Sequence, residues 1–346
     1  MATSKIVTSS ITDDAVTSGK IASGVVPTLR PTARPIMING NFEVWQRGTS
    51  FTSAGYTCDR WYQDLSGATA TLSRQTFTVG QSDVPSNPKY HLRQAVSTAN
   101  NNCGVFYRHE DVTTVTGNIT ISFYAKGTNP NGGNLHIITK QDFGSGGSTA
   151  VETATQNLTL SGSWQRFVFN FSLASISGKT VGSSSYLQML IKQPDGDSST
   201  NAWQLDLANF QVEVGTYTTS TIPPFQQETF GSNLDRCHRY YISYGNVGTT
   251  QSGFPARAYS GSGLMWAVTL PKPLRASPTV TLTGTIRAFG SSNTHDSTSA
   301  FGVTSYANTN STIVMLQSTG FSGLSNDRSY NVMAINDTFY TLDAEL

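Results

Sequence analysis

Short apolar–polar alternations, separated by loops rich in glycine, serine and asparagine, constrain the fold of this chain more than any other feature. In the stretches 119–124, 167–173 and 187–191 every second side chain is apolar, which is the two-residue period of a strand with one buried face. Turn-forming runs such as 128–133 and 144–148 lie between these stretches. Short strands joined by polar turns are typical of a β-sandwich or jelly roll. We therefore expect an all-β protein.

The composition agrees with this fold and limits the classes of partner. Only 12% of the 346 residues are charged and the formal net charge is +1, so electrostatics provide no case for binding nucleic acid or an anionic membrane. No apolar run approaches the length of a membrane span, and we expect no membrane insertion. The three cysteines, Cys58, Cys103 and Cys237, lack metal-finger spacing, so we expect free thiols in a reducing compartment.

An aromatic-rich stretch, Asn39–Tyr62, is expected to begin the sandwich. Its apolar residues Phe42 and Val44 stand two positions apart, as in a strand that buries one face. Further along the chain, the apolar residues change phase within 203–214. A β-bulge near Ala208–Asn209 would allow one strand to keep both apolar sets facing inward.

These patterns divide the chain into four parts. They are an N-terminal segment, 1–34; a jelly-roll domain, 35–225; a linker helix, 226–245; and a second β-sandwich, 246–346. The helix is predicted from Ser232, a favourable N-cap residue with an acidic residue three positions later. The second sandwich is expected because threonines and apolar residues alternate over 279–286.

The N-terminal segment carries an aliphatic residue at every fifth position. These residues are Ile6, Ile11, Val16, Ile21 and Val26. A period of five matches neither a helix nor a strand, so no single regular element buries all of them on one face. One interpretation is a disordered, low-complexity leader. The interpretation that we adopt is an attachment segment that is ordered only against partner chains.

Residues with catalytic or binding chemistry are sparse. The five histidines show no metal-ligand spacing and accompany no nucleophile motif, so we expect no catalytic residues, no enzyme activity and no cofactor. The densest acid–base cluster, 109–111, is interpreted as a solvated loop rather than a catalytic pair. Trp266, with Tyr259 and Phe254 nearby, is interpreted as a core residue, with a glycan-stacking platform formed by all three as the alternative.

Several motifs together resemble the tail-fibre and receptor-binding proteins of tailed bacteriophages. They are the runs NGNFEVWQRG at 39–48, DRWY at 59–62, SWQRF at 163–167, NFQVEVG at 209–215 and LDRCHRYY at 234–241. The run ITDDAV at 11–16 looks like the attachment segments of such fibres, while the C-terminal unit matches more weakly.

This resemblance implies a virion protein of the tail that is assembled in the host cytoplasm. It implies three partners: sister chains of a homotrimer, a tail or adaptor protein bound by the N-terminal segment, and a glycan on the host surface. The five-residue period gives only indirect support for the trimer.

The middle domain also looks like a carbohydrate-binding jelly roll. Domains of that kind often hold a structural calcium ion between a glutamate of the first strand and an acidic pair on the last strand. Glu43 fits the first position, but Ala208 and Asn209 stand where the acidic pair is expected, with Asp206 two positions earlier. One secure carboxylate is too few for a hard cation, so we predict no metal.

Together, these observations predict a non-enzymatic tail fibre, anchored by its N-terminus, that presents β domains for recognition of a host-surface glycan. Two alternatives stay open. One is a surface-glycan depolymerase, which needs a carboxylate pair in a groove. The other is a collar or decoration protein that binds no receptor.

Overall fold

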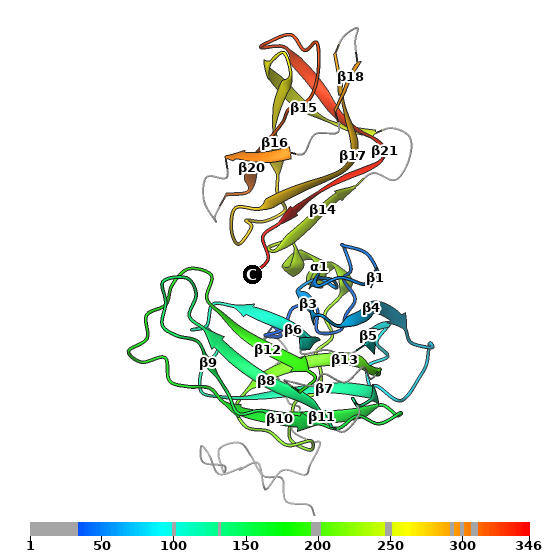
Figure 1. Ribbon diagram of the computed structural model, residues 1–346, viewed down its shortest axis with the longest axis vertical. Helices are drawn as coiled ribbons and strands as arrows, with labels where there is room; N and C mark the ends of the chain where they lie inside the picture. The colour runs from blue at the N-terminus through cyan, green and yellow to red at the C-terminus, as the bar shows by residue number, and fades with distance from the viewer. Residues whose placement is uncertain are drawn as a thin grey trace, which may run out of the picture.

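Two β units joined by a short helix make up the described part of the chain (Figure 1). The computed structural model describes residues 34–98, 102–130, 133–194, 202–245, 251–290, 294–297, 301–305 and 311–346. The predicted attachment residues Ile6, Ile11, Val16, Ile21 and Val26 lie outside the described residues. The prediction of an all-β chain with a short helix is confirmed.

The first unit is a sandwich of two antiparallel sheets. Its strands are β1 (Ser50–Phe51), β2 (Gly55–Tyr56), β3 (Trp61–Ser66), β4 (Thr69–Thr76), β5 (Tyr90–Thr98), β6 (Asn102–Glu110), β7 (Asn118–Thr128), β8 (Leu135–Asp142), β9 (Val151–Glu152), β10 (Gln156–Leu158), β11 (Gln165–Ser172), β12 (Tyr186–Lys192) and β13 (Trp203–Val214). The first sheet has the order β1-β4-β5-β13-β7-β11, and the second has the order β10-β8-β12-β6-β3-β2, with β9 beside β8.

Side chains from both sheets meet in one apolar core. Strand β7 carries the alternation predicted within 119–124, with Ile119, Ile121 and Phe123 in this core. Thr120 and Ser122, on its other face, are buried as well. Trp61 of β3 lies in this core, with its ring centroid 4.9 Å from that of Phe42 and 5.1 Å from that of Phe210. The aromatic-rich stretch therefore does contribute to the core, as the sequence predicted.

Residues 39–45, however, do not form the predicted strand. The φ angles of Asn39 and Phe42 are 58° and 56°, which lie outside the extended region. The Asn39 side chain accepts a hydrogen bond from Val44 N at 3.0 Å and donates to the carbonyl oxygens of Val44 and Asp59 at 2.9 and 3.1 Å. Phe42 and Val44 are both buried, but they are placed by a loop wound around one amide side chain.

The predicted bulge in 203–214 is confirmed. The register of β13 against β7 shifts between Ala208 and Gln211, and Asn209 adopts a φ of 48°. Leu207 and Phe210, which stand on either side of the shift, are both buried. The extra residue restores the inward phase because side chains in a strand alternate with a period of two.

The helix α1 (Phe230–Cys237) begins earlier than predicted. Its N-cap is Thr229, whose side chain accepts a hydrogen bond from the amide of Ser232 at 3.3 Å. The prediction of Ser232 as the cap is therefore wrong, because Thr229 has the extended backbone that a cap requires. Asn233 is buried in the helix and accepts from Asn39 N at 2.8 Å, so the helix packs on the loop at 39–45.

The second unit is a sheet that encloses its own apolar core. Its strands are β14 (Tyr241–Gly245), β15 (Gln251–Ser260), β16 (Gly263–Thr269), β17 (Thr279–Phe289), β18 (Thr294–Ser297), β19 (Phe301–Ser305), β20 (Ile313–Ser318) and β21 (Ser329–Asp343). Their order is β18-β17-β21-β15-β16-β20-β19, with β14 also paired to β21. Figure 1 shows that α1 and the C-terminal end of the chain lie between the two units.

The state of the three cysteines agrees with the prediction of free thiols. Cys58, Cys103 and Cys237 are free, as predicted, and the structure shows that all three are buried. Within the described residues, no helix combines the length and hydrophobicity needed to cross a bilayer.

Candidate functional site

The outer face of the second sheet carries an apolar row that runs across its strands. Pairing aligns, in order from β2 through β3, β6 and β12 to β8, the residues Tyr56, Tyr62, Phe106, Leu190 and Ile138. We call these five residues the aromatic row. The neighbours of Phe106 and Leu190 within their strands lie in the core. Because successive side chains of a strand point to opposite faces, the row faces away from the core.

The aromatic side chains of the row contact one another. The rings of Tyr62 and Phe106 are stacked, with centroids 4.5 Å apart and an interplanar angle of 10°. Tyr56 meets Tyr62 edge-on at 5.2 Å. Neighbouring strands are about 4.8 Å apart, so the four spacings of the row span about 19 Å. The row is therefore a long, narrow apolar strip.

Hydrogen-bonding residues flank this strip on both sides. They are Arg108, Gln188 and Lys140 on one side, and Asp64, Lys192 and His136 on the other. Arg108 donates from Nε to Gln188 Oε1 at 3.1 Å. Its guanidinium carbon lies 4.7 Å from the ring centroid of Phe106 and 4.4 Å from that of Tyr186. Cation–π contacts thus join the polar flank to the aromatic rings.

Burial and the charged residues of the flanks have opposite effects on the pKa of Asp64. Burial raises the pKa of Asp64, and the nearby charges of Lys192 and Arg108 act in the opposite direction. The face therefore presents a carboxylate acceptor and cationic donors beside an apolar floor. Such an arrangement suits a ligand with apolar C–H faces and many hydroxyl groups.

Trp266, the centre of the alternative stacking platform, lies in the core of the second unit and is only 2% exposed. Tyr259 is half-buried, and Phe254 packs against the core beside Tyr340, with ring centroids 6.3 Å apart. The Trp266 ring presents no open face to solvent. Trp266 is therefore a core residue, as favoured from the sequence, because its side chain points inward from β16.

Within the acid–base cluster 109–111, Glu110 is held by an ion pair instead of lying in a solvated loop. Glu110 binds Arg239 through two hydrogen bonds of 2.8 and 2.7 Å and accepts another from Tyr240 Oη at 2.7 Å. Burial acts to raise the pKa of Glu110, but the bonds from Arg239 and Tyr240 outweigh burial and lower it. Glu110 therefore connects the sandwich to the segment after α1.

The carboxylate considered for calcium on β13 has another partner. Asp206 is fully buried and binds Arg93 through two hydrogen bonds of 2.6 and 2.7 Å. Among the described residues, no group of three or more His, Cys, Asp or Glu side chains is arranged to hold a metal ion.

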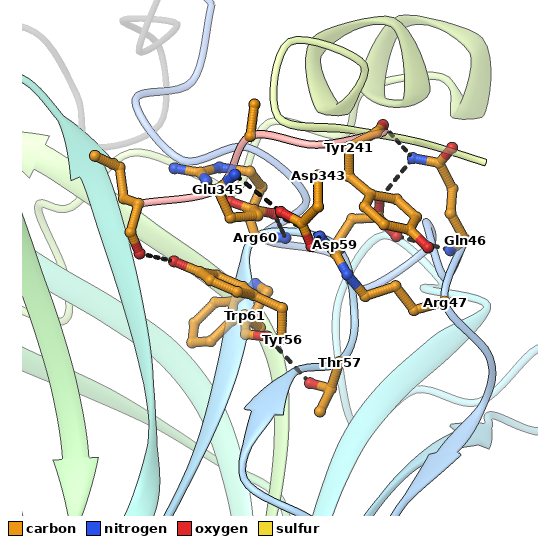
Figure 2. A network of polar contacts seen from close by, with 12 residues as sticks. Gln46, Arg47, Tyr56, Thr57, Asp59, Arg60, Trp61, Tyr241, Asp343 and Glu345 are labelled. Atoms are coloured by element: carbon orange, nitrogen blue, oxygen red, sulfur yellow. Dashed lines mark hydrogen bonds and ion pairs between the residues drawn. The ribbon is translucent and has the colours of Figure 1, made fainter. Parts of the chain in front are cut away.

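A network of charged residues joins the two units beside the aromatic row (Figure 2). The side chain of Glu345 is 3% exposed and pairs with Arg60 and with Arg47. Arg47 also binds Asp343 at 3.1 Å, and its guanidinium lies 3.5 Å from the ring centroid of Tyr241. The segment 343–346, which we call the C-terminal tail, is thereby inserted between the units.

Sequence analysis missed the aromatic row, although one signal was available. Three strands contain consecutive apolar residues where a half-buried strand would alternate, at 105–107, 137–138 and 189–191. In each case the extra apolar residue belongs to the row. Apolar residues on both faces of an outer sheet indicate that something covers or binds the second face.

No protein-family model matches the chain, and no curated protein matches it. Among solved structures, the N-terminal cellulose-binding domain of Cellulomonas fimi β-1,4-glucanase C is 14% identical, with 54% of this chain and 100% of that chain covered and a TM-score of 0.33. A xylan-binding domain from Paenibacillus barcinonensis is 14% identical (48% and 98% covered, TM-score 0.31). A cyclase from Fischerella is 12% identical (53% and 100% covered, TM-score 0.35). At these scores the likenesses identify neither a ligand nor an activity.

Proposed function

We propose that this chain is a non-enzymatic glycan-binding protein that binds a saccharide chain along the aromatic row. The observation that carries the proposal is the alignment of Tyr62, Phe106 and Leu190 in one apolar strip between two polar flanks. A strip of about 19 Å is long enough for a short oligosaccharide laid across the strands. Strands β3, β6 and β12 are each paired with a neighbour on both sides, which fixes the backbone of the site. Binding therefore requires little further ordering of the protein.

Each group has a distinct role in this binding. The half-buried ring of Tyr62 contacts the apolar face of a pyranose ring, and Phe106, which is only 5% exposed, stacks against Tyr62 and supports it. Leu190 extends the apolar floor. Arg108 donates to ligand hydroxyl oxygens, while the Asp64 carboxylate accepts from ligand hydroxyl groups. Hydrogen bonds fix the orientation of the sugar, and apolar contact supplies most of the affinity.

Binding without cleavage is the preferred form of the proposal. Glycoside hydrolysis generally uses two carboxyl groups on opposite sides of the scissile bond. Glu110 is bound to Arg239 and Asp206 to Arg93, so each already has a cationic partner. The surface-glycan depolymerase is the alternative, and it is tested together with binding.

The biological setting follows from the motif resemblance alone. On this proposal the chain is a tail fibre of a bacteriophage virion, assembled in the host cytoplasm as a homotrimer. Residues 1–34 bind a tail or adaptor protein, and the two β units face the host surface. A collar or decoration protein that binds no receptor is the alternative.

Replacing Tyr62 by alanine should weaken glycan binding by about tenfold or more, because a stacked aromatic anchor is removed from the centre of the strip. Host-surface polysaccharides are screened on an array, and the affinity for the best ligand is measured by titration calorimetry. Thermal unfolding reports whether the variant stays folded.

A matched control is Phe289→Ala, which removes an exposed aromatic ring from the second unit. It should bind as tightly as the unmodified chain. If Tyr62→Ala bound the glycan as tightly as the unmodified chain, the proposed site would be contradicted. Release of reducing ends from the bound polysaccharide by the unmodified chain would favour the depolymerase.

The attachment role is tested by replacing Ile11 and Ile21 together by aspartate. This double variant should still bind glycan but should be missing from purified particles, because the proposal has these side chains packed against partner chains, where a charge is costly. Immunoblots of purified virions measure incorporation. Ser9→Asp with Ser18→Asp is the control, since it adds the same charge beside the aliphatic positions. Normal incorporation of the isoleucine variant would show that the segment is passive.

A further inference from the structure

The C-terminal tail reaches the end of the aromatic row. The carbonyl oxygen of Leu346 accepts a hydrogen bond from Tyr56 Oη at 2.6 Å and another from Arg108 Nη1 at 2.7 Å. Tyr56 is the last residue of the row, and Arg108 belongs to its polar flank. One backbone oxygen of the second unit thus touches two residues of the proposed glycan site.

Arg108 is held in place by several different contacts. Gln188 accepts from its Nε, and the rings of Phe106 and Tyr186 lie against its guanidinium. Leu346 supplies the contact to Nη1. In the described part of the chain Nη2 has no hydrogen-bond partner. With Nε bound to Gln188 and Nη1 bound to Leu346, Nη2 is the nitrogen of Arg108 that is left for a ligand.

The tail itself is firmly positioned, so its carbonyl oxygen is a fixed acceptor. Arg275 donates to the carbonyl oxygens of Ala344 and Glu345 at 2.8 and 2.7 Å. The Glu345 side chain pairs with Arg60 and Arg47 between the units. Displacement of Leu346 would require these contacts to change as well.

We propose that the C-terminal tail is a positioning element of the glycan site, because Leu346 holds the Arg108 guanidinium in its ligand-binding orientation. An arginine side chain that is already ordered loses less entropy when it binds a sugar oxygen. The second β unit therefore tunes the affinity of a site on the first unit without contacting the glycan. This inference rests on the proposed function.

The test is a chain that ends at Glu345. It keeps the Glu345 side chain but lacks the Leu346 oxygen that Tyr56 and Arg108 bind. The affinity for the glycan identified on the array should fall about three- to tenfold, the cost of ordering one long side chain. Leu346→Ala restores the carbonyl oxygen and should restore the affinity. The midpoint of thermal unfolding should be similar for the shortened chain and for Leu346→Ala.

A double-mutant cycle separates positioning from a general structural effect. In a chain carrying Arg108→Ala, removing Leu346 should cause no further loss of affinity. An equal loss with and without the Arg108 side chain would overturn the inference, as would full affinity of the shortened chain. If the unmodified chain binds no glycan, the proposed function itself fails.

Discussion

Replacing Glu345 by alanine should lower the free energy of unfolding by about 3 to 5 kcal/mol, the usual cost of removing one partner from a buried ion pair. The side chains of Arg60 and Arg47 are only 1% and 9% exposed. Without the carboxylate, Arg60 loses its ion-pair partner in a site shielded from water, while Arg47 retains, among the described residues, only its ion pair with Asp343. The expected loss is therefore the penalty of uncompensated charge rather than the strength of one contact.

The direction of the Arg60 pKa supports this expectation. Burial acts to lower that pKa, but the Glu345 carboxylate and surrounding tyrosines outweigh burial and raise it. Because a guanidinium group keeps its proton in proteins, Arg60 cannot escape the penalty by becoming neutral when Glu345 is removed. Its guanidinium also lies 3.5 Å from the ring centroid of Tyr240, so it has little freedom to turn toward solvent.

Urea-induced unfolding of the whole chain measures the effect of Glu345→Ala. The matched control is Asp296→Ala, which breaks the pair between Arg287 and Asp296 on the surface of the second unit. Exposed pairs contribute about 1 kcal/mol or less, so the control should change little. Similar losses from the two variants would mean that Glu345 is not a buried counter-ion.

Replacing Asn39 by alanine should lower the free energy of unfolding by about 3 kcal/mol or more. Its side chain makes hydrogen bonds to Val44 N, Val44 O and Asp59 O, all in buried surroundings. Buried polar groups left without partners cost about 1 to 3 kcal/mol each. Alanine also fits the φ of 58° poorly.

Asn87→Ala is the control for the backbone contribution. Asn87 has a φ of 45° but is exposed and makes no side-chain hydrogen bond in the described part of the chain. Its replacement should cost only about 1 to 2 kcal/mol, the strain of the left-handed region. Thermal and urea unfolding compare the two variants. Equal losses would show that the Asn39 side chain does not hold the loop together.

The period of two in the apolar residues was sufficient to predict most of the sandwich. It identified β7, β11 and β12 because each strand buries one face against the core. The same period predicted the bulge at Asn209, since one added residue reverses the inward phase. These are local properties, and neighbouring residues carry all the information that they require.

The period of two gave a wrong prediction where side-chain hydrogen bonds determine the backbone conformation. Residues 39–45 have the spacing of a strand, yet Asn39 binds the backbone of Val44 and of Asp59. Asparagine and threonine compete with regular structure through such bonds. The same competition placed the helix cap at Thr229 rather than at Ser232. Spacing alone does not show which polar side chain wins this competition.

Long-range pairing decided the candidate site and the junction. Tyr56, Phe106 and Leu190 come together only through the register of strands that are far apart in the sequence. Glu345 meets Arg60 across 285 positions of the chain. Local patterns specify which side of a strand is apolar, whereas register and packing decide which side chains become neighbours. The strands and the core were therefore accessible from the residues alone, and the aromatic row and its contact with the C-terminal tail were not.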